Sequence, residues 1–255
     1  MNDERTHLLP EHPLDREVAL TLDVPARWGL AGVLAAIGIP LAGVLVVVPA
    51  LLLGLPGGKA AEQVYGLVAA GLAGAVAWAL GRRLVARYGG WRPALGFTLP
   101  ADGDGWLVVR WSARQLVLRY VLAAALVLLL PKDTHGGNLE GVGSLSLPAL
   151  VLLGVAAVLV APVLEELLFR GVLLRGLMRR LAFWPSAVIS SSVFGALHLG
   201  TLSDFGATVP TLVLTGVFGL LQCQLVRRTA RLGPAMGVHA VLNLVSLSLG
   251  VLTGA

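Results

Sequence analysis

The sequence predicts an all-α, polytopic transmembrane helix bundle of about seven to eight helices, with its functional residues in the membrane core. Three observations favour this fold class. Of the 255 residues, 56% are hydrophobic and only 13% are charged, whereas a soluble domain carries roughly 25% charged residues. The apolar residues form runs long enough to cross the hydrocarbon, which takes about 20 residues. These runs are rich in Ala, Leu, Val and Gly, a composition typical of helices rather than of a β-barrel.

The charge and cysteine content exclude other classes of protein. The net charge is +5, but the arginines lie at the ends of apolar runs and form no basic face, so we expect no nucleic-acid partner. The single cysteine, Cys223, excludes an internal disulfide framework. The first 27 residues are polar and charged, which is unlike the short basic start of a cleavable signal peptide.

Seven intervals are long and apolar enough to be membrane spans. They are 29–54, 63–81, 107–130, 147–178, 184–200, 208–226 and 232–252. The third has three arginines in its first half, so residues 103–118 either enter the membrane or lie along its surface. The fourth is too long for one perpendicular span and must tilt or protrude. The exact number of helices in 82–146 stays open.

The distribution of Lys and Arg predicts a cytoplasmic N-terminus. With that orientation, 17 of the 19 basic residues fall in inside loops, and only Lys59 and Lys132 fall outside, as the positive-inside rule requires. Tryptophans act as anchors at the membrane surface, and all six lie near the expected inner ends: Trp28, Trp78, Trp91, Trp106, Trp111 and Trp184. We expect an integral, multi-pass protein embedded in the lipid bilayer.

The stretch E-E-L-L-F-R, Glu165 to Arg170, places two carboxylates inside an apolar run. An ionisable group there costs roughly 2.5–3.5 kcal/mol on insertion scales and is a functional hypothesis by default. Glu166 and Arg170 have the i, i+4 spacing of a helical ion pair. Glu165 projects about 100° away and stays available for chemistry. The alternative is a helix end whose charges reach out to water.

Two further polar clusters lie on later spans. F-G-A-L-H ends in His198, and Ser191 lies two turns before it on the same face, so a serine nucleophile is one alternative and helix packing another. H-A-V-L-N places His239 and Asn243 on one face, where they could donate to an oxyanion, bind a metal through the histidine, or bond between helices. Gln222, Gln224 and Cys223 read as packing residues between helices.

Counting residues from the inner ends places Glu165, His198 and Asn243 roughly 18–21 Å deep, with His239 about 6 Å shallower. These groups can therefore meet. A carboxylate in a low-dielectric site can act as a general base on water, and the histidines can share that water or stabilise an oxyanion. The set suits hydrolysis of an amide bond. A divalent metal such as zinc, held by Glu165, His198 and His239, is the variant of this chemistry.

The three clusters, E-E-L-L-F-R, F-G-A-L-H and H-A-V-L-N, together resemble the motifs of the CPBP family of intramembrane metalloproteases. That family includes CAAX prenyl proteases and bacteriocin-processing or abortive-infection proteins. The resemblance covers about 147–252, which it implies is a catalytic core, preceded by a polar cytoplasmic tail (1–28) and accessory transmembrane helices (29–146).

The resemblance also implies roles for individual residues. It assigns Glu165 as the general base, with His198 at the catalytic water. It assigns His239 and Asn243 to the oxyanion, and Glu166 with Arg170 to support of the site. The implied activity is endopeptidase cleavage of a membrane-associated peptide or protein, with or without a lipid anchor, in a prokaryotic plasma membrane.

Two functions of other classes remain open on the sequence alone. One is a non-proteolytic immunity or scaffold protein that binds a partner in the membrane. The other is a proton-coupled transporter, because buried glutamate and histidine also relay protons or bind a cation.

Overall fold

The computed structural model describes residues 101–130, 142–145, 147–178, 180–199 and 208–253. The expected polar tail (1–28) and the expected spans at 29–54 and 63–81 lie outside this part of the chain. So do Trp28, Trp78 and Trp91 and the two basic residues expected on the outer side. The structure therefore leaves the total of seven to eight helices and the orientation of the N-terminus as predictions.

Every regular element in the described residues is a helix, which confirms the all-α class for that part. In chain order they are α5 (Asp104–Leu129), η3 (Val142–Ser144), α6 (Leu147–Gly154), η4 (Val155–Val160), α7 (Ala161–Glu166), η5 (Leu167–Leu174), α8 (Arg175–Met178), α9 (Phe183–Leu197), α10 (Thr208–Thr229) and α11 (Gly233–Thr253).

Three of these helices, α5, α10 and α11, are long and apolar enough to cross a membrane. They correspond to the expected spans at 107–130, 208–226 and 232–252, and they support an integral membrane protein. The expected span at 184–200 is different, because its helix α9 has only 15 residues, fewer than the roughly 20 that a full crossing takes.

The long interval at 147–178 is helical throughout, but its winding changes along its length. The elements η4 and η5 are π-helices, and the short α-helix α7 lies between them. Pro162, in the first turn of α7, has no backbone N–H. A proline disturbs the ladder of the preceding turn, and a wider π-turn is one of the ways in which a helix absorbs that disturbance. Sequence periodicity alone does not reveal this change.

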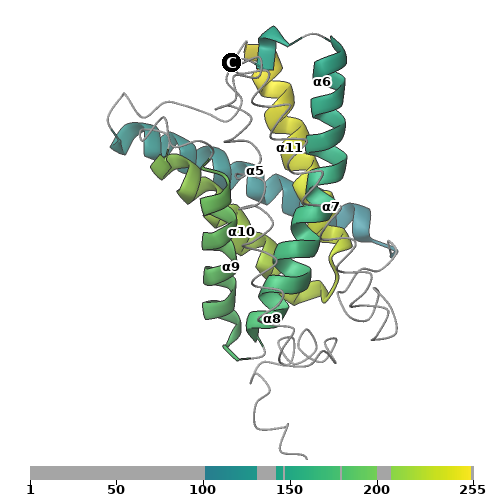
Figure 1. Ribbon diagram of the computed structural model, residues 1–255, viewed down its shortest axis with the longest axis vertical. Coiled ribbons are helices and arrows are strands. Elements are labelled where there is room, and N and C mark those ends of the chain that lie inside the picture. Colours follow the sequence, from purple (N-terminus) through teal and green to yellow (C-terminus); the bar gives the residue numbers. More distant parts are fainter. Residues whose placement is uncertain (1–100, 131–141, 146, 179, 200–207, 254–255) are drawn as a thin grey trace, which may run out of the picture.

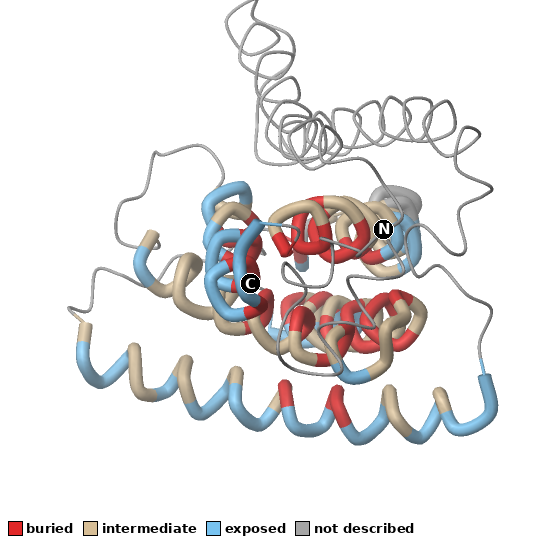
Figure 2. The backbone as a smooth tube through the Cα atoms, turned by 90° about the horizontal axis from the view of Figure 1, so that it is seen from below, coloured by how far each residue is buried: buried red, intermediate tan, exposed pale blue. Residues whose placement is uncertain are grey.

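Helix α5 lies across one side of the bundle that the other helices form. Figures 1 and 2 show it crossing them steeply, and the tube in Figure 2 is exposed along most of its length. Its only buried residues are Trp111, Ser112 and Gln115. Apolar side chains such as Val117 and Leu128 are exposed, as expected for a surface that lipid covers.

The apolar core gathers side chains from five elements, α5, η5, α9, α10 and α11. Phe169, Phe194 and Phe218 are buried at its centre, and α9 packs against α10. Trp111 belongs to this core with 8% of its surface exposed, whereas Trp106 and Trp184 are 67% and 54% exposed. The prediction of Trp111 as an anchor at the membrane surface is therefore wrong, because helix packing covers its ring.

Two arginines hold the connection between α10 and α11. Arg231 forms a bidentate ion pair with Asp104, at 2.7 and 2.6 Å, and so ties the first residue of α5 to this connection. The fully buried Arg175 donates to the carbonyl oxygen of Ala230 at 3.0 Å. Ala230 has a φ of 54°, so the chain turns sharply at the carbonyl that this guanidinium caps.

Candidate active site

Glu166 accepts three hydrogen bonds on one oxygen and is completely buried. Its Oε1 lies 3.1 Å from Arg170 Nη1, 3.0 Å from His239 Nδ1 and 3.3 Å from Gln222 Nε2. These donors come from η5, α11 and α10. The ion pair that the i, i+4 spacing predicted is present, but the histidine and the glutamine are long-range partners. Glu166 is therefore the point at which three elements of the bundle join.

Arg170 is also completely buried, and aromatic rings surround its guanidinium. The Cζ atom lies 4.6 Å from the Phe194 ring centroid, with the rings of Phe169 and Phe218 at 5.8 and 5.9 Å. Its Nη2 donates to the carbonyl oxygen of Gly219 at 3.3 Å. A buried ion pair is tolerated only when further hydrogen bonds satisfy it, and cation–π contacts add to that support.

Glu165 faces the other way and has a different set of neighbours. Its Oε2 lies 3.6 Å from His239 Nε2 and 3.8 Å from His198 Nε2. Both distances exceed those of a direct hydrogen bond, and Oε2 has no hydrogen-bond partner among the described residues. The structure therefore brings Glu165 together with His198, as the depth argument expected, and also with His239, which that argument placed about 6 Å shallower.

The hydrogen bonds on the far side of each ring determine which nitrogen carries the proton. His198 Nδ1 lies 2.8 Å from the carbonyl oxygen of Phe194, and a carbonyl oxygen only accepts, so this Nδ1 donates. His239 Nδ1 donates to Glu166 in the same way. In the neutral rings both Nε2 atoms then carry lone pairs. Two imidazole nitrogens thus lie near one carboxylate oxygen, Oε2 of Glu165.

Exposure differs across this group of residues. The side chains of Glu165 and His198 are each 29% exposed, while those of His239 and Glu166 are 4% and 0% exposed. The Glu165 side of the group is therefore the partly exposed side, although the Oε2 atom itself is buried. The Glu166 side is the interior support.

Asn243 lies one helical turn after His239 on α11, but its amide already has a partner. Nδ2 donates to the carbonyl oxygen of Ala157 at 2.7 Å. Ala157 belongs to the π-helix η4, so this bond ties α11 to the widened helix just before Glu165. The amide has a second N–H, which leaves the expected role at an oxyanion as a proposal.

Ser191, the alternative nucleophile, faces α10. Its Oγ lies 3.8 Å from Cys223 Sγ, and a Cβ added to Gly219 would come within 2.9 Å of the serine Cβ. Gly219 is small because α9 and α10 touch there. Ser191 therefore packs between helices, and the geometry gives no support to a serine–histidine nucleophile.

The described residues do not present a preformed metal site. Glutamate and neutral imidazole are suitable ligands for zinc, and the unpartnered Oε2 of Glu165 is consistent with one. However, no three His, Cys, Asp or Glu side chains in the described ranges are placed to hold a metal ion. The two Nε2 atoms and Glu165 Oε2 are the atoms that would hold a metal, but as placed in the described residues they are not grouped as metal ligands.

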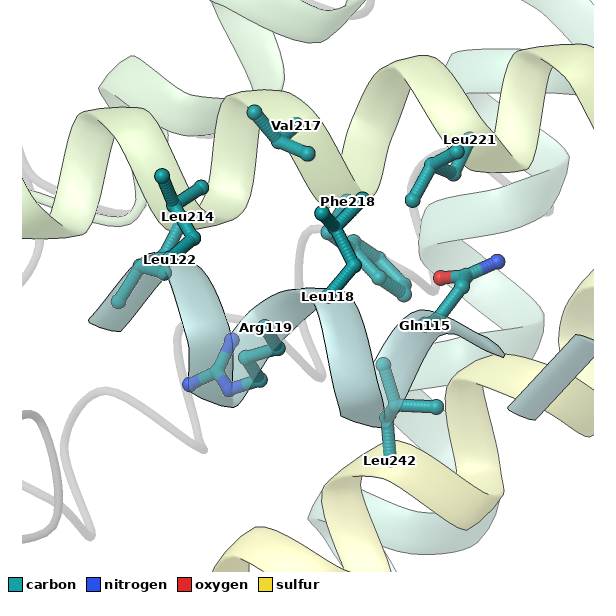
Figure 3. Close-up of a pocket in the computed structure, with 9 residues that line it drawn as sticks. All are labelled: Gln115, Leu118, Arg119, Leu122, Leu214, Val217, Phe218, Leu221 and Leu242. Atoms are coloured by element: carbon teal, nitrogen blue, oxygen red, sulfur yellow. The ribbon is translucent and has the colours of Figure 1, made fainter. Parts of the chain in front are cut away.

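A small pocket lies beside this group, between α5, α10 and α11. Figure 3 shows its lining, in which apolar side chains surround Gln115 and Arg119. Phe218 forms one wall, and its ring also packs edge-on against His239 with 4.8 Å between centroids. The pocket is therefore separated from the histidine by one aromatic ring.

Two glutamines are connected to this group. Gln222 was expected to join helices, and its Nε2 donates to Glu166 and, at 2.7 Å, to the carbonyl oxygen of Ala235. Gln115 was not singled out, although its Nε2 donates to Gln222 Oε1 at 3.1 Å. The available signal was a glutamine within an otherwise apolar span, which carries a cost in lipid and therefore indicates a partner.

Comparison with known families supports the resemblance that the three motifs indicated. Residues 147–245 match the family described as Rce1-like, type II CAAX prenyl endopeptidase. This range contains Glu165, Glu166, Arg170, His198 and His239, together with Asn243. No curated protein and no solved structure matches the chain.

Proposed function

We propose that this protein, whose residues 147–245 form an Rce1-like domain of the type II CAAX prenyl endopeptidases, is an intramembrane endopeptidase that uses Glu165 to activate water. The observation that carries the proposal is the convergence of Glu165 Oε2 with two imidazole Nε2 atoms at 3.6 and 3.8 Å. A water molecule can donate to a carboxylate oxygen and to an imidazole nitrogen at the same time.

In the first step, Glu165 acts as the general base. A water that donates to Glu165 Oε2 and to one Nε2 has both hydrogens engaged, and its lone pair points toward a peptide carbonyl. As its oxygen attacks the carbonyl carbon, one O–H bond breaks and the proton passes to Glu165. A positioned base of this kind contributes about 10²–10⁴-fold to the rate.

In the second step, the tetrahedral intermediate collapses. The negative charge on the former carbonyl oxygen needs a donor, and the second N–H of Asn243, one helical turn from His239, is the candidate. Glu165 then returns its proton to the amide nitrogen, the C–N bond breaks, and the amine leaves. Glu166 takes no proton in this scheme, because it is completely buried and forms the ion pair with Arg170.

The proposed substrate is a peptide or protein segment associated with the membrane, with or without a lipid anchor. The site is part of a helical bundle with an exposed apolar surface, so a membrane-associated chain can reach the exposed edge of Glu165. The family match supports a peptide bond as the target.

The test uses the purified protein in detergent and a library of quenched fluorescent peptides, with and without a C-terminal prenyl group. We expect the wild type to cleave a subset of the library and Glu165→Ala to cleave none. Full activity should survive exhaustive chelation, because the described residues offer no cluster of metal ligands. Loss of activity on chelation, with recovery on adding zinc, would restore the metal-dependent variant.

Two outcomes would replace the proposal. If the wild type cleaves nothing while the Glu165→Ala protein still protects cells, the binding or immunity function is correct. If proton-coupled uptake into liposomes occurs and fails in Glu165→Gln, the transporter function is correct.

A further inference from the structure

Helix α5 lies outside the segment that matches the family, yet it carries a buried polar face against the site. Of its three buried residues, Ser112 and Gln115 are polar, and their side chains are 3% and 2% exposed. Apolar packing does not need a buried amide, and burying one costs free energy unless it is hydrogen-bonded. Gln115 therefore calls for a reason beyond covering the bundle.

The hydrogen bonds of Gln222 show what Gln115 contacts. Gln222 Nε2 meets two acceptors, Glu166 Oε1 and the carbonyl oxygen of Ala235, so the nitrogen must be on that side of the amide. Its Oε1 must then face α5, where it accepts from Gln115 Nε2 at 3.1 Å. The amide orientations are fixed by the network, and the chain of donors runs in one direction from α5 to Glu166.

We infer that Gln115 is a positioning residue for the proposed active site, acting through Gln222 to hold the Glu166 carboxylate and, through it, the Nδ1–H form of His239. This inference rests on the proposed function for its catalytic consequence. It extends the site beyond residues 147–245, because a helix outside the matched segment supplies its outermost hydrogen bond.

The physical reason is the cost of an unpaired acceptor. Without Gln115, Gln222 Oε1 is buried with no donor, and the amide relieves this by turning. Turning moves Nε2 away from Glu166, which then loses one of its three donors. The His239 ring loses part of the restraint that keeps Nε2 directed at Glu165. In metal sites, mutating one residue that hydrogen-bonds to a ligand lowers activity or metal affinity by about 10–100-fold.

One polar atom of Gln115 is not used in this network. Its Oε1 is buried and has no hydrogen-bond partner among the described residues, and Figure 3 shows the amide oxygen directed toward the pocket and the nitrogen directed away from it. The residue is therefore held by its single bond to Gln222, so that removal of Gln222 should release Gln115.

The test is a double-mutant cycle on the peptide that the wild type cleaves fastest. We expect Gln222→Leu to lower kcat roughly tenfold with little change in KM, and Gln115→Leu to lower it by less. The double variant should match Gln222→Leu within about twofold, because Gln115 acts only through Gln222. Effects that multiply in the double variant, or an unchanged kcat in Gln115→Leu, would overturn the inference.

Two matched controls separate this role from general packing. Gln224→Leu makes the same change two residues along α10, and Ser112→Ala removes a buried hydroxyl that has no hydrogen-bond partner among the described residues. We expect both to leave kcat and KM unchanged. Thermal midpoints of all variants in detergent would show whether any of them fails to fold.

A second measurement decides the inference even if the wild type cleaves none of the peptides. In protein labelled with ¹⁵N-histidine, the ring nitrogen shifts report which nitrogen carries the proton, and His239→Gln assigns the signal among the five histidines. The wild type should hold His239 with the proton on Nδ1, and Gln115→Leu should give a mixture of forms. An unchanged signal in Gln115→Leu and Gln222→Leu would show that the network positions nothing.

Discussion

Glu165 and Glu166 are adjacent in the sequence and identical in chemistry, yet the fold places them in opposite environments. Glu166 is 0% exposed and has three donors on Oε1, including Arg170. The Glu165 side chain is 29% exposed, and its Oε2 faces two imidazoles without a hydrogen bond. One carboxylate is paired with a guanidinium and held, and the other has a partly exposed side chain and no hydrogen bond on Oε2. The difference teaches that a site needs both kinds, because the held group orients the ring that the other group uses.

The largest expected effect comes from removing the charge of Glu165 alone. Glu165→Gln should lower kcat by about 10³-fold, because the general base is lost. The thermal midpoint should stay near that of the wild type, since the new amide can donate to the two Nε2 atoms. Cleavage rates and thermal unfolding in detergent measure the two quantities. Normal activity in this variant, with loss in Glu166→Gln, would reverse the roles of the two carboxylates.

Glu166→Gln tests the structural half of the comparison. It leaves the buried guanidinium of Arg170 without a counter-charge, so the free energy of unfolding should fall by about 3–5 kcal/mol. Equilibrium unfolding in mixed detergent and SDS micelles measures this change. The control is the double variant Glu166→Leu with Arg170→Met, which removes both charges and should recover much of the stability. A double variant less stable than Glu166→Gln would contradict this account of the pair.

Asn243→Ala asks whether the amide supports the reaction or only the helix. If its second N–H stabilises the oxyanion, kcat should fall by about 10²-fold with KM nearly unchanged. The bond to the Ala157 carbonyl oxygen predicts a separate loss of about 1 kcal/mol in the free energy of unfolding. A lower free energy of unfolding with unchanged kcat would show that Asn243 has only a structural role, the hydrogen bond that joins α11 to η4.

The smallest expected effect lies at the partly exposed ion pair between Asp104 and Arg231, whose side chains are 13% and 25% exposed. Asp104→Asn should lower the free energy of unfolding by about 0.2–1 kcal/mol, because water screens such a pair. Asp102→Asn is the matched control at an exposed position two residues earlier, and it should change nothing. A loss as large as that of Glu166→Gln would show that exposure does not separate the two pairs.

The sequence predicted the chemistry of the site more fully than its supports. The spacing of Glu166 and Arg170 predicted their ion pair, because partners four residues apart on a helix face each other whatever the tertiary structure is. The separation of Glu165 from Glu166 around the helix axis followed from the same geometry. Counting residues along each span placed Glu165, His198 and Asn243 at one depth and His239 about 6 Å shallower, whereas the structure has His239 beside Glu165 and Asn243 bonded to Ala157. Counting could not predict that His239 lies between the two carboxylates and bonds to Glu166.

The supports could not be predicted, because they depend on contacts between distant segments. Gln115 and Gln222 are 107 residues apart, and no local pattern indicates that they meet. Trp111 was expected at the membrane surface, and only the packing of α5 against the bundle shows that it is buried. The π-helices η4 and η5 on either side of α7 were also missed, although Pro162 lies just after the end of η4.

By itself, the sequence predicted the helical class, the membrane environment and the candidate reactive groups. Composition and i, i+4 spacing act within one segment and need no partner, so they can be read before folding is considered. Only the tertiary structure decided which glutamate is held and which is available. That choice depends on where His239, Gln222 and Arg170 meet, and long-range packing of apolar helices sets the meeting point.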